Sequence, residues 1–149
     1  NMLDNYRVLI TDSAETERYK NYMLKYGNKY EFKLYSDINN ASPDAAQSRL
    51  FICYDGGQAH LLSQFARTLT IFGPGSADLW KPFEFEDYLP YKNFNNGVTV
   101  IKSKGKSGHM AVYYPVWCSP CYDIGCKTKP CLYKIDPGSL KQIISENIK

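Results

Sequence analysis

Residues 50–82 read LFICYDGGQAHLLSQFARTLTIFGPGSADLWKP, and the pattern of this stretch decides the fold. A short apolar run over residues 50–53 predicts a buried strand. Two glycines follow the run and allow the backbone to turn sharply. Apolar residues at helical spacing then predict a helix over residues 58–66, and a second apolar run predicts a strand over residues 68–72.

The glycine turn joins the end of the first strand to the start of the helix. The first backbone N–H groups of a helix have no internal acceptor, and the helix dipole is positive there. This environment suits an anion such as a diphosphate, so residues 55–60 are the predicted site. The alternative interpretation is a Gly-Gly turn that merely connects a strand to a helix.

The chain before this stretch also alternates between strand and helix. Strands are predicted over residues 7–11 and 30–35, and helices over residues 13–26 and 42–48. This rhythm predicts an α/β fold, a Rossmann-like parallel sheet with helices on both faces. Ligands of such sheets bind beyond the carboxyl ends of the strands, where residues 55–60 and 73–76 are expected to lie.

The pattern is weaker beyond residue 82. Residues 84–96 are polar and aromatic without a clear period, and we predict a loop. The remaining predictions are a strand over residues 98–102, a solvated basic loop over 102–109, an apolar segment over 110–117 that packs on the sheet, and a closing helix over 139–148. Asp136 and Pro137 mark the start of that helix.

Composition limits the class of protein. The chain has 149 residues, of which 44% are hydrophobic and 15% aromatic, so we expect one globular domain. A net charge of +3 is too small to indicate nucleic-acid binding by itself. No apolar run reaches the roughly 18 residues of a membrane-spanning helix. No signal peptide opens the chain, so we expect an intracellular protein with reduced thiols.

Four of the five cysteines are close in sequence: Cys118, Cys121, Cys126 and Cys131. Their spacing is that of a zinc knuckle with cysteine in place of histidine, and four thiolates can close a tetrahedral site. A structural zinc or iron ion is one interpretation, and buried free thiols or disulfides formed by oxidation are the others. A bound metal would favour a metal-clipped α/β binding module with nucleic-acid contact and no transferase activity.

The motif D-x-G-x-x-H after a strand, followed by an apolar strand and F-G-P-G-S-A-D-L-W-K-P, resembles the donor half of glycosyltransferase family 9. These enzymes are the ADP-heptose:lipopolysaccharide heptosyltransferases. The cysteine-rich tail that runs to Ile135-Asp136-Pro137 resembles the same family's C-terminal signature. The resemblance covers residues 50–148 and is weak before them. It implies that residues 1–149 are a single nucleotide-sugar-binding domain, the C-terminal half of a two-domain GT-B transferase.

The resemblance also implies roles for single residues. The backbone N–H groups of Gly56, Gly57 and Gln58 would face the phosphates, although Gly56 stands where the family commonly has Thr or Ser. His60 would donate to phosphate or lock the turn. Asp55 would fix the loop or contact sugar hydroxyls.

A glutamate that holds the ribose hydroxyls in the family would correspond to Glu15, and Glu17 fits nearly as well. No catalytic residue is implied in this chain, because the general base lies in the family's N-terminal domain. The chain alone is therefore expected to bind donor weakly and not to turn over. No metal cofactor is required, since helix dipole and side chains stabilise the leaving diphosphate.

The resemblance finally implies partners and a location. The donor would be ADP-heptose or a similar nucleotide sugar, and the acceptor a lipid-linked or other glycan. No nucleic acid is expected as a partner. The complete enzyme would be cytoplasmic and would work near the inner face of the membrane.

Overall fold

The computed structural model describes residues 7–10, 31–35, 37–82, 87–123 and 125–148. The chain divides into two compact units, Asn1–Asp44 and Ala45–Lys149. The first unit contains a two-stranded parallel sheet of β1 (Arg7–Ile10) and β2 (Glu31–Leu34). Both strands were predicted. The helix predicted over residues 13–26 lies outside the described residues.

A 3-10 helix, η1 (Ile38–Ala41), follows β2 and leads into α2 (Ser42–Ala46). The Asp37 side chain caps η1 by accepting the backbone N–H of Asn39 at 2.9 Å. The short helix α2 was predicted, whereas η1 was not.

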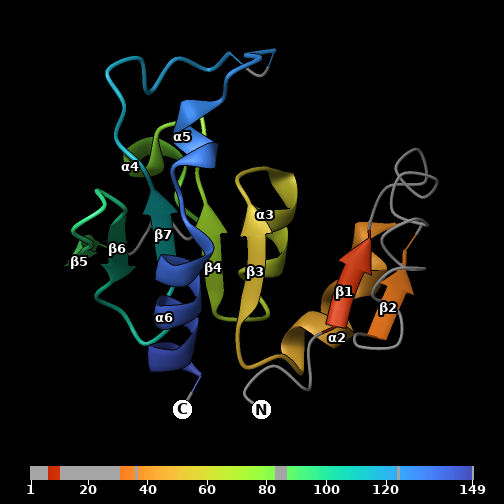
Figure 1. The fold of residues 1–149 in the computed structure, drawn as a ribbon. Coiled ribbons are helices and arrows are strands. Elements are labelled where there is room, and N and C mark those ends of the chain that lie inside the picture. The colour runs from red at the N-terminus through yellow and green to blue at the C-terminus, as the bar shows by residue number, and fades with distance from the viewer. Residues whose placement is uncertain (1–6, 11–30, 36, 83–86, 124, 149) are drawn as a thin grey trace. The chain divides into compact units, whose positions relative to one another are not determined.

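The second unit is built on a five-stranded sheet with the strand order β3-β4-β7-β6-β5 (Figure 1). Its strands are β3 (Phe51–Tyr54), β4 (Thr68–Ile71), β5 (Tyr88–Asn93), β6 (Thr99–Ser103) and β7 (Met110–Tyr113). β3, β4 and β7 pair in parallel, and β6 is antiparallel to both β7 and β5. Four strands therefore run in one direction, and this mixed, mostly parallel sheet is consistent with the predicted α/β Rossmann-like fold.

Helices cover both faces of this sheet (Figure 1). On one face lies α6 (Pro137–Asn147), and on the other lie α3 (Gly57–Leu62) and α4 (Ala77–Trp80). The short helix α5 (Pro130–Tyr133) lies beyond the ends of β4 and β7 (Figure 1). No helix in the described part of the chain has the length and apolar character needed to cross a membrane.

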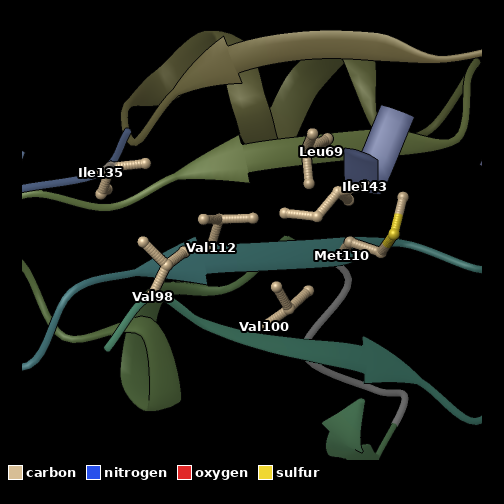
Figure 2. Packing of buried hydrophobic residues seen from close by; sticks show 7 residues of the cluster. All are labelled: Leu69, Val98, Val100, Met110, Val112, Ile135 and Ile143. Carbon is tan, nitrogen blue, oxygen red and sulfur yellow. The ribbon is translucent and has the colours of Figure 1, made fainter. Parts of the chain in front are cut away.

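Alternating side chains of the central strands form two core layers. Met110 and Val112 of β7 point to the face of α6, where Ile143 is fully buried among them (Figure 2). The intervening Ala111 points to the other face and packs with Phe72. Burial on both faces explains why these strands appear in the sequence as continuous apolar runs.

The closing helix α6 begins close to its predicted position. Asp136 caps it by accepting the backbone N–H groups of Gly138 at 2.7 Å and Ser139 at 3.1 Å, and Pro137 occupies the first turn. The predicted inward residues pack on the sheet: Ile143 is buried, and Leu140 and Ile144 lie partly buried against the same cluster.

The loop predicted over residues 84–96 is wrong, because its described part contains the strand β5. β5 lies at the edge of the sheet next to β6, and most of its side chains are exposed. Pro90 lies within it, and the register shifts between Pro90 and Lys92. An edge strand tolerates proline and needs no buried face, so it leaves no periodic signal in the sequence.

Candidate functional site

A pocket of about 270 Å³ lies where β3 and β4 end. Its lining consists of Tyr54, Asp55, Ile71, Gly73, Pro74, Gly75, Tyr122 and Leu132. Tyr54 and Ile71 are the last residues of two parallel strands, so both carboxyl ends reach the same pocket. This is where sheets of this class bind their ligands. The structure thus brings Asp55 together with the glycine-rich loop that follows β4, as predicted.

The carboxylate of Asp55 lies against the loop after β4. The backbone N–H of Asp55 donates to the Ile71 carbonyl at 3.0 Å, which ties the turn to β4. A Cβ added to Gly75 would lie 2.6 Å from Asp55 Oδ2. Burial raises the pKa of Asp55, whereas nearby His60 and the N–H of Gly56 lower it. Asp55 is therefore a partly buried acceptor that suits hydrogen-bond donors better than phosphate.

The two glycines of the turn, Gly56 and Gly57, differ in the space around them. Gly56 has φ 157° and ψ 179°, a region used almost only by glycine, and the Gln58 side chain lies 3.1 Å from where its Cβ would be. A threonine or serine at Gly56, as is common in the resembling family, would be strained here. Gly57 opens α3, and nothing lies within 4 Å of a Cβ added there. The N–H groups of Gly57 and Gln58 belong to the first helical turn, where a helix supplies no acceptor.

The helix after the turn is shorter than predicted. α3 ends at Leu62, and the N–H of Ser63 bonds back to the Ala59 carbonyl. A helix of six residues has few aligned peptide dipoles, so an anion at the turn would depend mainly on the two amides. His60 is exposed in α3 and does not line the pocket, although it acts electrostatically on Asp55.

The cysteine-rich segment forms one wall of the pocket. The backbone N–H groups of Cys121 and Tyr122 both donate to the Pro74 carbonyl, at 3.0 and 3.2 Å. Tyr122 has φ 57°, which is uncommon for a residue with a side chain. Leu132 of α5 covers Gly73, because a Cβ at Gly73 would lie 2.9 Å from Leu132 Cγ. Sequence reasoning missed this wall, which depends on contacts between distant segments.

The cysteines predicted as metal ligands are free thiols in different environments. Cys131 is buried, and burial raises the pKa of its thiol, with additional contributions from Cys121 and Cys118. Cys126 Sγ instead accepts the N–H of Lys129 at 3.3 Å. Among the residues described, no group of three or more His, Cys, Asp or Glu side chains could hold a metal ion. The structure therefore does not assemble the predicted four-thiolate centre.

Two residues of the predicted solvated loop over 102–109 are in fact buried, Ser103 at the end of β6 and His109. His109 is 1% exposed, and its Nδ1 accepts the backbone N–H of Thr68 at 3.1 Å. Thr68 Oγ1 lies 2.9 Å from the same nitrogen. His109 comes directly before β7, so its side chain belongs to the interior of the sheet. The remaining predicted contacts, Glu15 and Glu17, lie outside the described residues.

Comparisons with protein-family models, with curated proteins and with solved structures found no match for this chain. The fold, the position of the pocket and the chemistry of its lining are therefore the observations that bear on function.

Proposed function

We propose that this chain is the donor-binding domain of a heptosyltransferase-like glycosyltransferase, with ADP-heptose as the expected donor. The observation that supports this most is the pocket at the carboxyl ends of β3 and β4. Its lining contains Asp55 and the loop from Gly73 to Gly75, which belong to the two segments that resemble family 9. Nucleotides bind at this edge of parallel α/β sheets.

The negative charge of Asp55 determines which part of the donor lies in the pocket and which part lies outside it. The Asp55 carboxylate repels phosphate, so the uncharged part of the donor lies in the pocket. The diphosphate lies outside, at the amides of Gly57 and Gln58. Gly57 is exposed and has open space beside it, so a ligand can approach its backbone closely.

Sugar transfer breaks the bond between the sugar and the diphosphate, and negative charge grows on the leaving phosphate. N–H groups already aimed at that phosphate stabilise the charge without reorganising. The acceptor, a lipid-linked or other glycan, and its general base belong to the acceptor domain. The complete enzyme works in the cytoplasm at the inner face of the membrane, and this chain alone binds donor without turning it over.

The experiment that tests this proposal is a calorimetric titration of the full chain with ADP. Gly57→Asp places a negative charge beside the amides, and we expect the affinity to fall at least about tenfold, equivalent to ~1.4 kcal/mol. Gly57→Ala is the matched control, because it adds a side chain without a charge and keeps the N–H, so the difference in affinity between the two variants isolates the effect of the charge. Thermal unfolding of both variants verifies that they fold. Equal ADP affinity in Gly57→Asp and wild type would show that the turn is not the site.

The alternative function, a metal-clipped binding module, has less support because the described residues include no group of three or more His, Cys, Asp or Glu side chains that could hold a metal ion. Metal analysis of protein purified under reducing conditions tests it. A zinc or iron ratio near one per chain would favour the module, and a ratio near zero would remove it.

A further inference from the structure

We propose that Cys121 and Cys131 are an oxidation-sensitive thiol pair that a peroxide converts into a disulfide, and that this disulfide fixes one wall of the pocket. Both thiols are free in the structure and belong to the cysteine-rich segment. They would react in this way whichever ligand the pocket takes.

Both cysteines lie beside the loop that follows β4. The backbone N–H of Cys121 donates to the Pro74 carbonyl at 3.0 Å. Cys131 directly precedes Leu132, whose Cγ would lie 2.9 Å from a Cβ added to Gly73. Gly73 and Pro74 are neighbours in the chain, so two separate segments meet at one dipeptide. The chain therefore folds back between the two cysteines and brings their backbones towards each other.

The thiols themselves are close enough to interact. Burial is the main reason why the pKa of Cys131 is raised, and the thiols of Cys121 and Cys118 raise it further. A charged neighbour shifts a pKa in this way only over a short distance. Cys126 has other partners, because its Sγ accepts the backbone N–H of Lys129 at 3.3 Å. Cys131 therefore has Cys121 and Cys118 as its neighbouring thiols.

Exposure to solvent assigns the two members of the pair different roles. Cys121 is exposed, so an oxidant in solution reaches its sulfur, whereas Cys131 is buried. Cys121 also affects the pKa of Cys131 more than Cys118 does, which indicates that Cys121 is the nearer thiol. Redox-sensing cysteines commonly combine an accessible thiol, which is oxidised first, with a second thiol that resolves the product. Cys121 is the accessible member and Cys131 the resolving member.

The oxidation balances with hydrogen peroxide as the only co-reactant. The Cys121 thiolate attacks one peroxide oxygen, the O–O bond breaks, and a sulfenic acid and hydroxide form. The Cys131 thiolate then attacks the sulfenic sulfur, so that an S–S bond forms, the S–O bond breaks and a second hydroxide leaves. The protons of the two thiols convert both hydroxides to water. The thiols together lose two electrons, which reduce the peroxide.

The disulfide acts on the pocket because each cysteine directly precedes a residue of its lining, Tyr122 and Leu132. In the reduced chain this wall is held by the hydrogen bonds of Cys121 and Tyr122 to the Pro74 carbonyl and by the packing of Leu132. A disulfide restricts the two Cα atoms to a separation of roughly 4.4–6.8 Å. Oxidation therefore fixes the backbone on both sides of the wall.

The test treats the full chain with hydrogen peroxide and maps disulfides by mass spectrometry of a non-reducing tryptic digest. Cleavage after Lys127 separates Cys131 from the other cysteines of the segment, and fragmentation of the linked peptides assigns its partner. Wild type should give a link between Cys121 and Cys131 that dithiothreitol removes. Cys121→Ser should lose the link, and thermal unfolding verifies that this variant folds. Cys126→Ser is the matched control and should form the link as fast as wild type.

NMR of the isotope-labelled chain measures the effect on the pocket. The backbone amide signals of Tyr122 and Leu132 should shift on oxidation and return on reduction, while the signals of α6 remain in place. Unchanged signals of these two residues in the cross-linked chain would overturn the effect on the wall.

The other outcomes bear on the pair itself. A link from Cys118 to Cys121 or to Cys131 would overturn the assigned pairing. Sulfenic or sulfinic acid at Cys121 with Cys131 still a free thiol would overturn the formation of a disulfide. ADP is absent from all of these measurements, so their results are independent of whether the proposed function is correct.

Discussion

Asp55 and Gly75 lie against each other at the pocket, so that a Cβ at position 75 would be 2.6 Å from Asp55 Oδ2. The two residues follow neighbouring parallel strands, β3 and β4. The N–H of Asp55 donates to Ile71, which limits how far the turn can move. The position of the carboxylate therefore depends on the absence of a side chain in the facing loop.

We predict that Gly75→Ala displaces the Asp55 carboxylate and lowers the ADP affinity about tenfold. The fold should persist, because overpacking of this size costs about 1–3 kcal/mol and can relax by rotating the carboxylate. Calorimetric titration measures the affinity, and urea denaturation measures the stability. Tyr133→Leu serves as the control, with affinity close to that of wild type, because Tyr133 is 76% exposed and does not line the pocket. Unchanged ADP binding by Gly75→Ala would contradict a role for Asp55 in the pocket.

The two glycines of the turn should respond differently to alanine. Gly56→Ala forces a side chain into a conformation used almost only by glycine, so we expect the free energy of unfolding to fall by about 1–3 kcal/mol. Gly57→Ala should be neutral or stabilising by up to ~1 kcal/mol, since it meets no atom and restricts the unfolded chain. Urea denaturation compares the two. A Gly56→Ala protein as stable as Gly57→Ala would be inconsistent with the turn described here.

The stability of the chain should depend on pH through Asp55. Burial raises its pKa above the ordinary 3.8 in the folded state. Protonated Asp55 therefore stabilises the folded state relative to ionised Asp55. This stabilisation is fully present at pH values below the pKa of Asp55 in the unfolded chain, and it is lost as the pH rises through the pKa of Asp55 in the folded state. Asparagine does not ionise, so Asp55→Asn does not lose stability in this way. The variant should therefore gain stability relative to wild type as the pH rises from about 3 to about 7. Urea midpoints across this range measure the difference, and the opposite trend would refute the prediction.

The two histidines of the chain should differ in their effect on stability. His109→Ala leaves the buried N–H and hydroxyl of Thr68 without their acceptor, and we expect a loss of about 2–4 kcal/mol. His60→Ala changes an exposed side chain, so the free energy of unfolding should stay within about 0.5 kcal/mol of wild type. Chemical denaturation of both variants makes the comparison. Similar losses in the two would argue against a structural role for His109.

The cysteines should react with iodoacetamide in an order set by their surroundings. Hydrogen bonds from Thr128 and Lys129 lower the pKa of Cys126, and this thiol should be alkylated first. Burial raises the pKa of Cys53 to about 12, and this thiol should react last. Mass spectrometry of the native protein at early times gives the order. Early labelling of Cys53 would mean that the pairing of β3 with β4 opens readily.

The sequence predicts the centre of the fold because several signals agree there. Three features of the sequence each match one element, and all three elements are present. These features are the apolar run before Asp55, the glycines after it and the apolar run from residue 68. The edge strand β5 was missed because its side chains face solvent and Pro90 interrupts it. The burial of His109 was missed because a histidine beside lysines and glycines is typical of an exposed loop.

The candidate site could be predicted only in part. Asp55 and the loop after β4 follow apolar runs, so their meeting at one edge of a parallel sheet could be inferred. Tyr122 reaches the pocket through backbone contacts with Pro74, and no sequence pattern predicts such a pairing of distant segments. The end of α3 at Leu62 was also not predictable, because the apolar spacing continues to Phe65 while the chain leaves the helix.

The central claim is that a nucleotide diphosphate binds where β3 and β4 end, and an NMR titration of the isotope-labelled chain with ADP tests it most directly. We predict that the backbone amide signals of Gly57, Gln58 and Tyr122 shift together with one saturating dependence on ADP concentration. The signals of α6, on the opposite face of the sheet from α3, should remain in place. Shifts confined to α6 or to other surfaces, with these three amides unchanged, would contradict the claim.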